Sequence, residues 1–290
     1  MNDFLLSILL GIVEGLTEFL PVSSTAHLRI AEALLNFDLH DSFWKMYTIV
    51  IQLGAILALP VYFWQRIIQF LGTFPRGERG DRNFITHPIS LTMIAFVVTA
   101  LPSWASTKLI GKNLESLTVM ALALLIGGIV MWVVDAMVTR PRVTHMEEMN
   151  LPQAVWIVAV QILSAVFPGT SRSMATIAAG QLAGLSRPAA LEFSFFLSMP
   201  TMVAATLYDL YKTLAPNRNS AMEGNLAPLA VNTHQWILLA IGLVVSFVVA
   251  LGVVAWFMRW VRARGFAPFA IYRILLGGTI LFGLGLGAIK

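Results

Sequence analysis

Six apolar runs, each about as long as a lipid bilayer is thick, constrain the fold of this chain more than any other feature. A helix needs roughly 20 predominantly apolar residues to cross the hydrocarbon core of a bilayer. Only 12% of the residues are charged, whereas about a quarter are charged in a typical soluble domain. We therefore predict an all-α polytopic membrane protein, because the runs lack the alternation of a transmembrane barrel. The six runs cover residues 43–64, 88–108, 116–138, 188–211, 235–258 and 267–289.

The formal net charge of +4 does not indicate a nucleic-acid partner. Most basic residues lie in the short segments between the apolar runs, where Lys and Arg set the orientation of a membrane protein. The chain has no cysteine, which excludes disulfides and thiolate metal sites. Its apolar N-terminal segment has no basic region and carries two glutamates, so we do not expect a signal peptide.

Two further apolar regions, residues 4–37 and 151–185, are interrupted near their middle. They contain the sequences LPVSSTAH and FPGTSRSMA. Proline removes a backbone donor and stops a helix. Each of the two helical parts of a region is marginally short for spanning the hydrocarbon core of a bilayer. We predict that each region is a re-entrant hairpin, in which one helix enters the membrane and a second leaves on the same side.

The two interrupted regions also align with each other. A shift of 147 places Pro21 on Pro168 and Ser24 on Ser171, and seven of 26 positions from residue 12 to residue 37 are identical. The same shift aligns the following apolar run and loop. Each half then has one hairpin and three crossings, and an odd number of crossings inverts the second half. We predict a single membrane domain, residues 1–290, with inverted-topology pseudo-repeats over about 1–140 and 148–290.

Two carboxylates stand in the first hairpin. Glu14 and Glu18 are four residues apart and so share one face of a helix. Carboxylate oxygens are ligands for both Mg²⁺ and Ca²⁺. The pair therefore predicts a divalent-cation site, or a contact with an arginine.

Hydroxyl residues follow the proline of the first hairpin. The amides near Ser23, Ser24 and Thr25 would begin a helix, and helix N-termini bind phosphate through their free N–H groups and the helix dipole. Ser24 and His27 are three residues apart on one face. This spacing is typical of a nucleophile and its base, or of two phosphate ligands.

We call the interruptions of the two hairpins the first and second breaks. The second break also offers hydroxyl groups, but its charged residue is positive rather than negative. Gly169 permits a tight turn, and Thr170, Ser171 and Ser173 offer hydroxyls. Arg172 adds a planar cation suited to phosphate oxygens. Carboxylates in the first hairpin and a phosphate-binding site at the second break together favour a phosphoryl-transfer function. Catalysis of that reaction is mostly positioning and charge stabilisation.

The residues alone leave other interpretations open. Serine and threonine in membrane helices often bond to the backbone or to neighbouring helices. Inverted repeats with broken helices are also the architecture of secondary transporters, so a transporter or lipid flippase is the alternative function. Two more charges, Glu192 and Arg273, fall in apolar runs, and Arg273 is either a second phosphate contact or the partner of Glu192.

These motifs together closely resemble the undecaprenyl-diphosphatases of the bacitracin-resistance type, over nearly the whole chain. The resemblance implies removal of the terminal phosphate of undecaprenyl diphosphate. This hydrolysis would regenerate the lipid carrier of cell-wall synthesis and confer bacitracin resistance. The motifs that carry the resemblance are EGLTEFLPVSSTAH, IQLGAILA, PGTSRS, EFSFFLSMP, TLYDLYK and PFAIYR.

The resemblance also implies roles for single residues. It leaves open whether the serine attacks with the histidine as its base or the histidine is itself the nucleophile. Two positions depart from the family pattern: Ala26 replaces a frequent glycine, and Thr170 a frequent phenylalanine. The implied roles are an acidic pair at Glu14 and Glu18, a nucleophile and histidine at Ser24 and His27, a phosphate cradle at Ser171, Arg172 and Ser173, and a second basic contact at Arg273.

The distribution of Lys and Arg predicts the orientation. Ten of these residues would lie on the side away from the termini and seven on the side that holds them. Because positive loops favour the cytoplasm, we expect both termini and the active-site mouth outside the bacterial inner membrane. Membrane lipids are expected partners, and a homodimer is left open.

Overall fold

The computed structural model describes residues 2–35, 37, 41–105, 116–214 and 231–287, and within these ranges the chain is helical with no strand. The helices of the first half are α1 (Asp3–Thr17), α2 (Ser24–Leu35), α3 (Ser42–Tyr62), α4 (Trp64–Thr73), α5 (Pro88–Ala105) and α7 (Leu117–Met137). A short 3₁₀ helix, η1 (Met146–Glu148), precedes α8 (Leu151–Val166), α9 (Arg172–Leu182), α10 (Arg187–Leu214), α11 (Thr233–Arg264) and α12 (Ala267–Gly285).

Five of these helices are long and apolar enough to cross a membrane: α3, α7, α10, α11 and α12. The chain is therefore a multi-pass helical membrane protein, as the apolar runs predict. The sixth predicted run, 88–108, corresponds to α5, and its last three residues lie outside the described ranges. Helix α11 continues to Arg264, six residues beyond the predicted end, so its terminal arginines stand where cations stabilise a helix dipole.

The loop expected after the first apolar run, residues 65–87, contains most of helix α4, which begins one residue earlier at Trp64. Its sequence WQRIIQFLGT is strongly amphipathic, with Phe70 buried in the main hydrophobic core and Ile67 packed against it. Ten residues are too few for a crossing, which is why the apolar-run criterion missed this helix.

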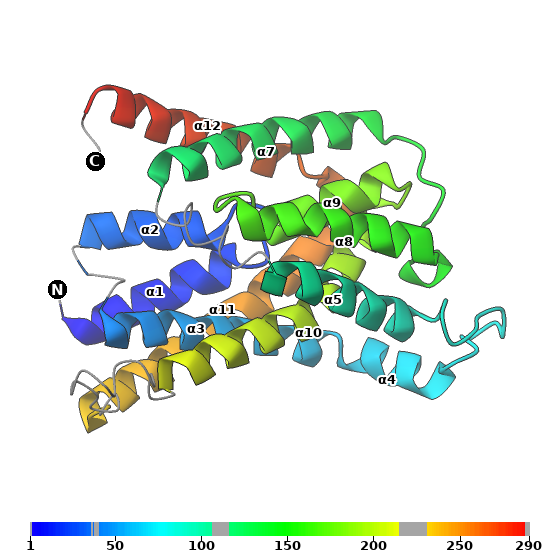
Figure 1. The fold of residues 1–290 in the computed structure, drawn as a ribbon, viewed down its shortest axis with the longest axis horizontal. Helices are drawn as coiled ribbons and strands as arrows, with labels where there is room; N and C mark the ends of the chain where they lie inside the picture. Colours follow the sequence, from blue (N-terminus) through cyan, green and yellow to red (C-terminus); the bar gives the residue numbers. More distant parts are fainter. Residues whose placement is uncertain (1, 36, 38–40, 106–115, 215–230, 288–290) are drawn as a thin grey trace.

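Each of the two interrupted regions forms a pair of helices joined at the predicted break. Figure 1 shows α1–α2 and α8–α9 extending from opposite ends of the molecule, with their breaks near its middle. In chain order, each hairpin precedes three helices of at least 18 residues: α3, α5 and α7 in the first half, and α10, α11 and α12 in the second.

The two breaks differ in length by one residue. Ser23 and Ser171 both have a positive φ, of 75° and 67°, and each immediately precedes the second helix of its hairpin. Their backbone roles match, so Ser24 corresponds structurally to Arg172. The sequence alignment with a shift of 147 instead pairs Ser24 with Ser171, one position before Arg172. The two alignments differ because one more residue separates Pro168 from the start of α9 than separates Pro21 from the start of α2.

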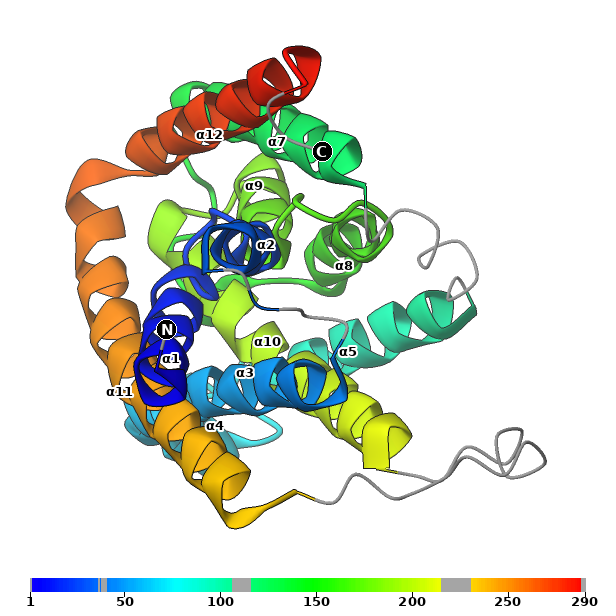
Figure 2. The same ribbon diagram turned by 90° about the vertical axis from the view of Figure 1, so that its left-hand side faces the viewer.

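Viewed along the long axis, α2 and α9 lie in the interior, surrounded by the long helices (Figure 2). Small residues allow α3 to approach α11 closely. A Cβ atom on Gly54 would lie 2.5 Å from the carbonyl oxygen of Leu243. Such contacts between small residues are the usual way in which membrane helices pack, and here they help to fix the frame that holds the hairpins.

Candidate active site

The carboxylate of Glu18 joins the two breaks. Glu18 lies at the C-terminal end of α1. Its Oε2 accepts a hydrogen bond of 2.5 Å from Ser24 Oγ, and its Oε1 lies 3.1 Å from Nη2 of Arg172. Ser24 and Arg172 are the first residues of α2 and α9. A carboxylate, a hydroxyl and a guanidinium from both halves of the chain therefore meet at one point.

The starts of α2 and α9 also present free backbone amides. Ser23 Oγ accepts from Ala26 N, and Ser171 Oγ accepts from Met174 N, so each serine caps its helix. Within the described ranges, no partner bonds the N–H groups at the first two positions of either helix, residues 24, 25, 172 and 173. Unpaired N–H groups at a helix N-terminus form an anion site, and two such ends meet here.

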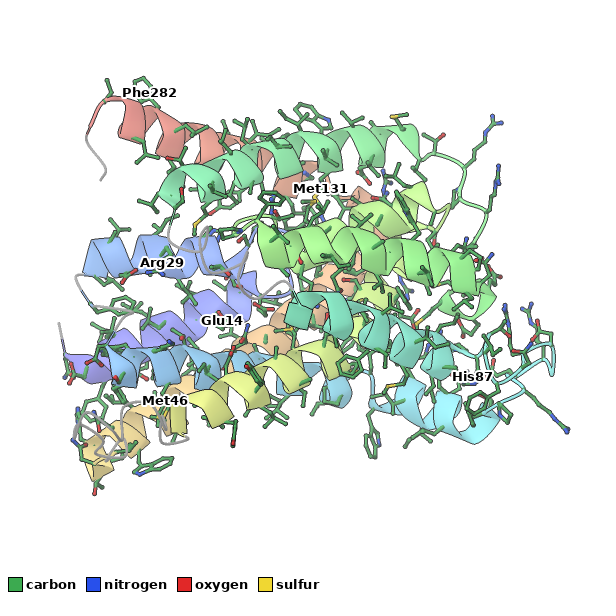
Figure 3. All side chains as sticks on the ribbon, viewed as in Figure 1. Glu14, Arg29, Met46, His87, Met131 and Phe282 are labelled. Atoms are coloured by element: carbon green, nitrogen blue, oxygen red, sulfur yellow. The ribbon has the colours of Figure 1, made fainter. Side chains whose placement is uncertain are left out.

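A cavity of about 190 Å³ lies between the breaks. Glu14, one turn before Glu18, is near the middle of the helical assembly in Figure 3, so the site lies deep between the ends of the molecule. The cavity is lined by Glu18, Ser23, Ser24, Thr25, Gln52, Ser164, Pro168, Gly169, Ser171, Arg172 and Met202.

Glu14 does not line this cavity but lies one helical turn before Glu18, which does. It is 1% exposed, and its Oε2 has no hydrogen-bond partner in the described part of the chain. An unpaired buried carboxylate oxygen fits a cation ligand, and Mg²⁺ is usually held by one or two carboxylates together with substrate phosphate oxygens. Glu14 therefore offers a free oxygen to a divalent cation, whereas both carboxylate oxygens of Glu18 already have protein partners, Ser24 and Arg172.

His27 is held away from Ser24. Its Nδ1 lies 2.7 Å from the carbonyl oxygen of Ser23, and its Nε2 lies 2.6 Å from Oη of Tyr272 on α12. A carbonyl only accepts, so we assign the proton to Nδ1, and Nε2 accepts from Tyr272. The hydroxyl of Ser24 donates to Glu18 instead, and the expected contact between Ser24 and His27 is absent from the described hydrogen bonds.

The remaining residues of the second break support its shape. Ser173 Oγ donates to the carbonyl oxygen of Leu20 in the first break, at 3.0 Å, and also contacts Ser171 Oγ. Gly169 has a φ of 91°, and a Cβ there would lie 2.5 Å from the carbonyl oxygen of Met120. Only glycine suits that position. Thr170 and Ser173 do not line the cavity.

Arg273 and Glu192 do not form a pair. Arg273 is fully buried, and its guanidinium donates to backbone carbonyls in both breaks and in α7. Glu192 instead accepts from Arg66 Nε at 2.8 Å. Arg273 is also not among the residues that line the cavity, so the structure supports neither of the two contacts that the sequence predicted for it.

Sequence reasoning missed four residues at the site. Gln52 on α3, Ser164 on α8 and Met202 on α10 line the cavity, and Tyr272 contacts His27. Gln52 interrupts an otherwise apolar run, which is a usable signal of function. Ser164 and Met202 carry no such signal.

The fold and the site together define a polytopic helical membrane protein with a polar cavity between two broken-helix hairpins. The chain belongs to the family described as bacitracin resistance protein BacA, whose model matches residues 7–279.

Two curated relatives of this chain carry closely similar names. A protein of Koribacter versatilis (strain Ellin345) called undecaprenyl-diphosphatase is 62% identical over 97% of this chain and 98% of its own length. A protein of Paramagnetospirillum magneticum (strain ATCC 700264 / AMB-1) called undecaprenyl-diphosphatase 2 is 42% identical over 94% of this chain and 96% of its own. The similarity thus extends over nearly the whole chain.

Proposed function

We propose that this chain is an undecaprenyl-diphosphatase, which hydrolyses undecaprenyl diphosphate to undecaprenyl phosphate and inorganic phosphate. Family membership and the relatives' names support this activity and its link with bacitracin resistance. The observation that carries the mechanism is the meeting of Ser24, Glu18 and Arg172 beside two free helix N-termini.

In the proposed reaction, Ser24 Oγ attacks the distal phosphorus and its proton passes to Glu18. The bond from phosphorus to the bridging oxygen breaks, and undecaprenyl phosphate leaves. Water then attacks the phosphoserine and the bond from phosphorus to Ser24 Oγ breaks. The proton held by Glu18 returns to Ser24 Oγ, and both hydrogens of the water leave with the inorganic phosphate. Arg172 and the amides of α2 and α9 stabilise charge on the equatorial oxygens.

The other site residues have supporting roles in this proposal. Ser23, Thr25, Gly169 and Ser171 shape the phosphate pocket, and Thr170 and Ser173 hold the second break. His27 orients the start of α2 rather than acting as the base for Ser24, because both of its ring nitrogens already have partners. Glu14 and Glu18 would hold Mg²⁺ or Ca²⁺, which would supply positive charge for the diphosphate.

The proposed location is the bacterial inner membrane, with the cavity open to the extracytoplasmic side. The distribution of Lys and Arg supports that orientation. Undecaprenyl diphosphate and membrane lipids are the proposed partners, and the long prenyl chain would leave the site laterally between helices.

The test is phosphate release from undecaprenyl diphosphate by the purified protein in detergent. We expect turnover by the wild type, loss of turnover in Ser24→Ala and full turnover in Ser42→Ala, a matched control at an exposed position on α3. A wild-type protein that is monodisperse but releases no phosphate would contradict the proposal and favour a transporter or flippase.

A further inference from the structure

Arg273 is a buried cation whose contacts are all with the backbone. Its Nη1 donates to the carbonyl oxygen of Pro21 at 3.1 Å. Its Nη2 lies 3.0–3.1 Å from the carbonyl oxygens of Ala123, Gly169 and Thr170, so its two N–H groups are shared among three acceptors. One side chain on α12 thus bonds the first break, the second break and α7. No carboxylate pairs with it in the described part of the chain.

Helix α7 has a slot for this side chain. A Cβ atom on Gly127 would lie 2.5 Å from Arg273 Nη2 and 3.3 Å from its Cζ. A Cβ atom on Gly128 would lie 3.1 Å from Arg273 Cβ. Two consecutive glycines therefore leave the space in which the guanidinium reaches both breaks.

Three of the four bonded carbonyls, those of Pro21, Gly169 and Thr170, are ones that a broken helix exposes. A helix end leaves backbone groups without partners, and inside a membrane each unsatisfied group is costly because no water reaches it. Arg273 satisfies carbonyls in both breaks at once. Since buried charges are expensive unless well bonded, the bonds of Nη1 and Nη2 also stabilise the guanidinium, whose Nε has no partner in the described part of the chain.

Fixing a carbonyl also fixes the amide of the same peptide. In a trans peptide the C=O and N–H point in opposite directions. The carbonyl of Thr170 points at Arg273, so the N–H of Ser171 points away from it. That N–H has no partner within the described ranges, and Ser171 lines the cavity. Arg273 therefore determines the direction of an amide at the phosphate pocket.

We propose that Arg273 is a positioning residue that locks the two breaks together and aims the Ser171 amide at the substrate phosphate, without binding the phosphate itself. The role as a catalytic support rests on the proposed phosphatase activity. The role as a lock between the hairpins does not, so the two parts are separable by experiment.

The first arm measures kinetics with undecaprenyl diphosphate, and product inhibition by inorganic phosphate. We expect Arg273→Met and Gly127→Ala to lower kcat at least tenfold, while KM and the inhibition constant for phosphate stay within about threefold. Arg273→Lys should recover only part of kcat, because a point charge cannot bond four carbonyls as the planar fork does. Gly252→Ala on α11, where a Cβ meets nothing within 4 Å, is the matched control and should equal wild type. A tenfold weaker phosphate inhibition with unchanged kcat in Arg273→Met would identify a phosphate ligand and overturn the proposal.

The second arm measures distances between spin labels and needs no activity. The chain has no native cysteine, so Leu34→Cys on α2 and Leu182→Cys on α9, both exposed, can be labelled selectively. We expect a single narrow distance distribution in the doubly labelled parent protein, which retains Arg273. The distribution should broaden or shift when Gly127→Ala or Arg273→Met is added. Distributions identical to that of the parent in both variants would overturn the lock, whether or not the protein releases phosphate.

Discussion

The guanidinium of Arg172 lies 3.1 Å from the carboxylate of Glu18, although 154 positions separate the two residues in the chain. This ion pair closes the contact between the two breaks. Both side chains are largely buried, and a buried cation or anion is strongly destabilising when its partner is removed. A substrate phosphate that enters the cavity would compete with Glu18 for Arg172, which would free the carboxylate to accept the proton of Ser24.

The contact between Tyr272 and His27 should contribute modestly to turnover. Tyr272→Phe removes one hydrogen bond to Nε2 of His27 and keeps the ring. A typical hydrogen bond contributes about 1 kcal/mol, or roughly a fivefold effect. We expect kcat for phosphate release to fall by about that factor. A loss of two or more decades would mean that Tyr272 acts directly in the reaction.

Removal of divalent cations should abolish activity. Glu14 has an unpaired oxygen beside Glu18, and two carboxylates with a diphosphate make a suitable cation site. We expect chelator-treated protein to regain turnover with Mg²⁺ or Ca²⁺, and Glu14→Gln and Glu18→Gln each to impair it. Full activity in excess chelator would remove the cation from the mechanism.

A second ion-pair cluster should make stability depend on pH. Arg66 on α4 lies 2.6 Å from Glu147 in η1 and 2.8 Å from Glu192 on α10. Burial acts to raise the pKa of Glu147, but the hydrogen bond and charge of Arg66 outweigh it, and the pKa is lowered from 4.5. A lowered pKa stabilises the folded state above the unfolded pKa, and this stability is lost as pH falls through the folded pKa.

The measurement for this cluster is thermal unfolding in detergent at several pH values. Glu147→Gln should melt below wild type at pH 7, and the difference should shrink as the pH falls below about 4.5. A difference that stays constant over this range would show that the charge of Glu147 does not contribute to stability.

Orientation can be tested with a reporter fused after Lys290. The ten-to-seven distribution of Lys and Arg predicts an extracytoplasmic C-terminus. We expect a fused alkaline phosphatase to be active and a fused green fluorescent protein to be dark. The reverse pattern would invert the proposed topology.

The sequence predicted the positions of the helices and their breaks better than the contacts between individual side chains. Pro21 and Pro168 located both breaks, because proline acts locally on the helix that contains it. The partners of Ser24, His27 and Arg273 were not predicted. Each depends on where another helix lies, and periodicity within one helix does not carry that information.

The most direct test of the account is the effect of Arg172 on turnover, because the central claim is that two breaks from the two halves form one active site. Removal of such a contact to a sheltered transition state costs roughly 3–4 kcal/mol, or two to three decades in rate. We expect Arg172→Ala to lose at least about a hundredfold in kcat for phosphate release from undecaprenyl diphosphate. Arg172→Lys should recover only part of it, since lysine lacks the planar fork. Both variants should purify as monodisperse protein. A well-folded Arg172→Ala protein within about threefold of wild type would contradict the account.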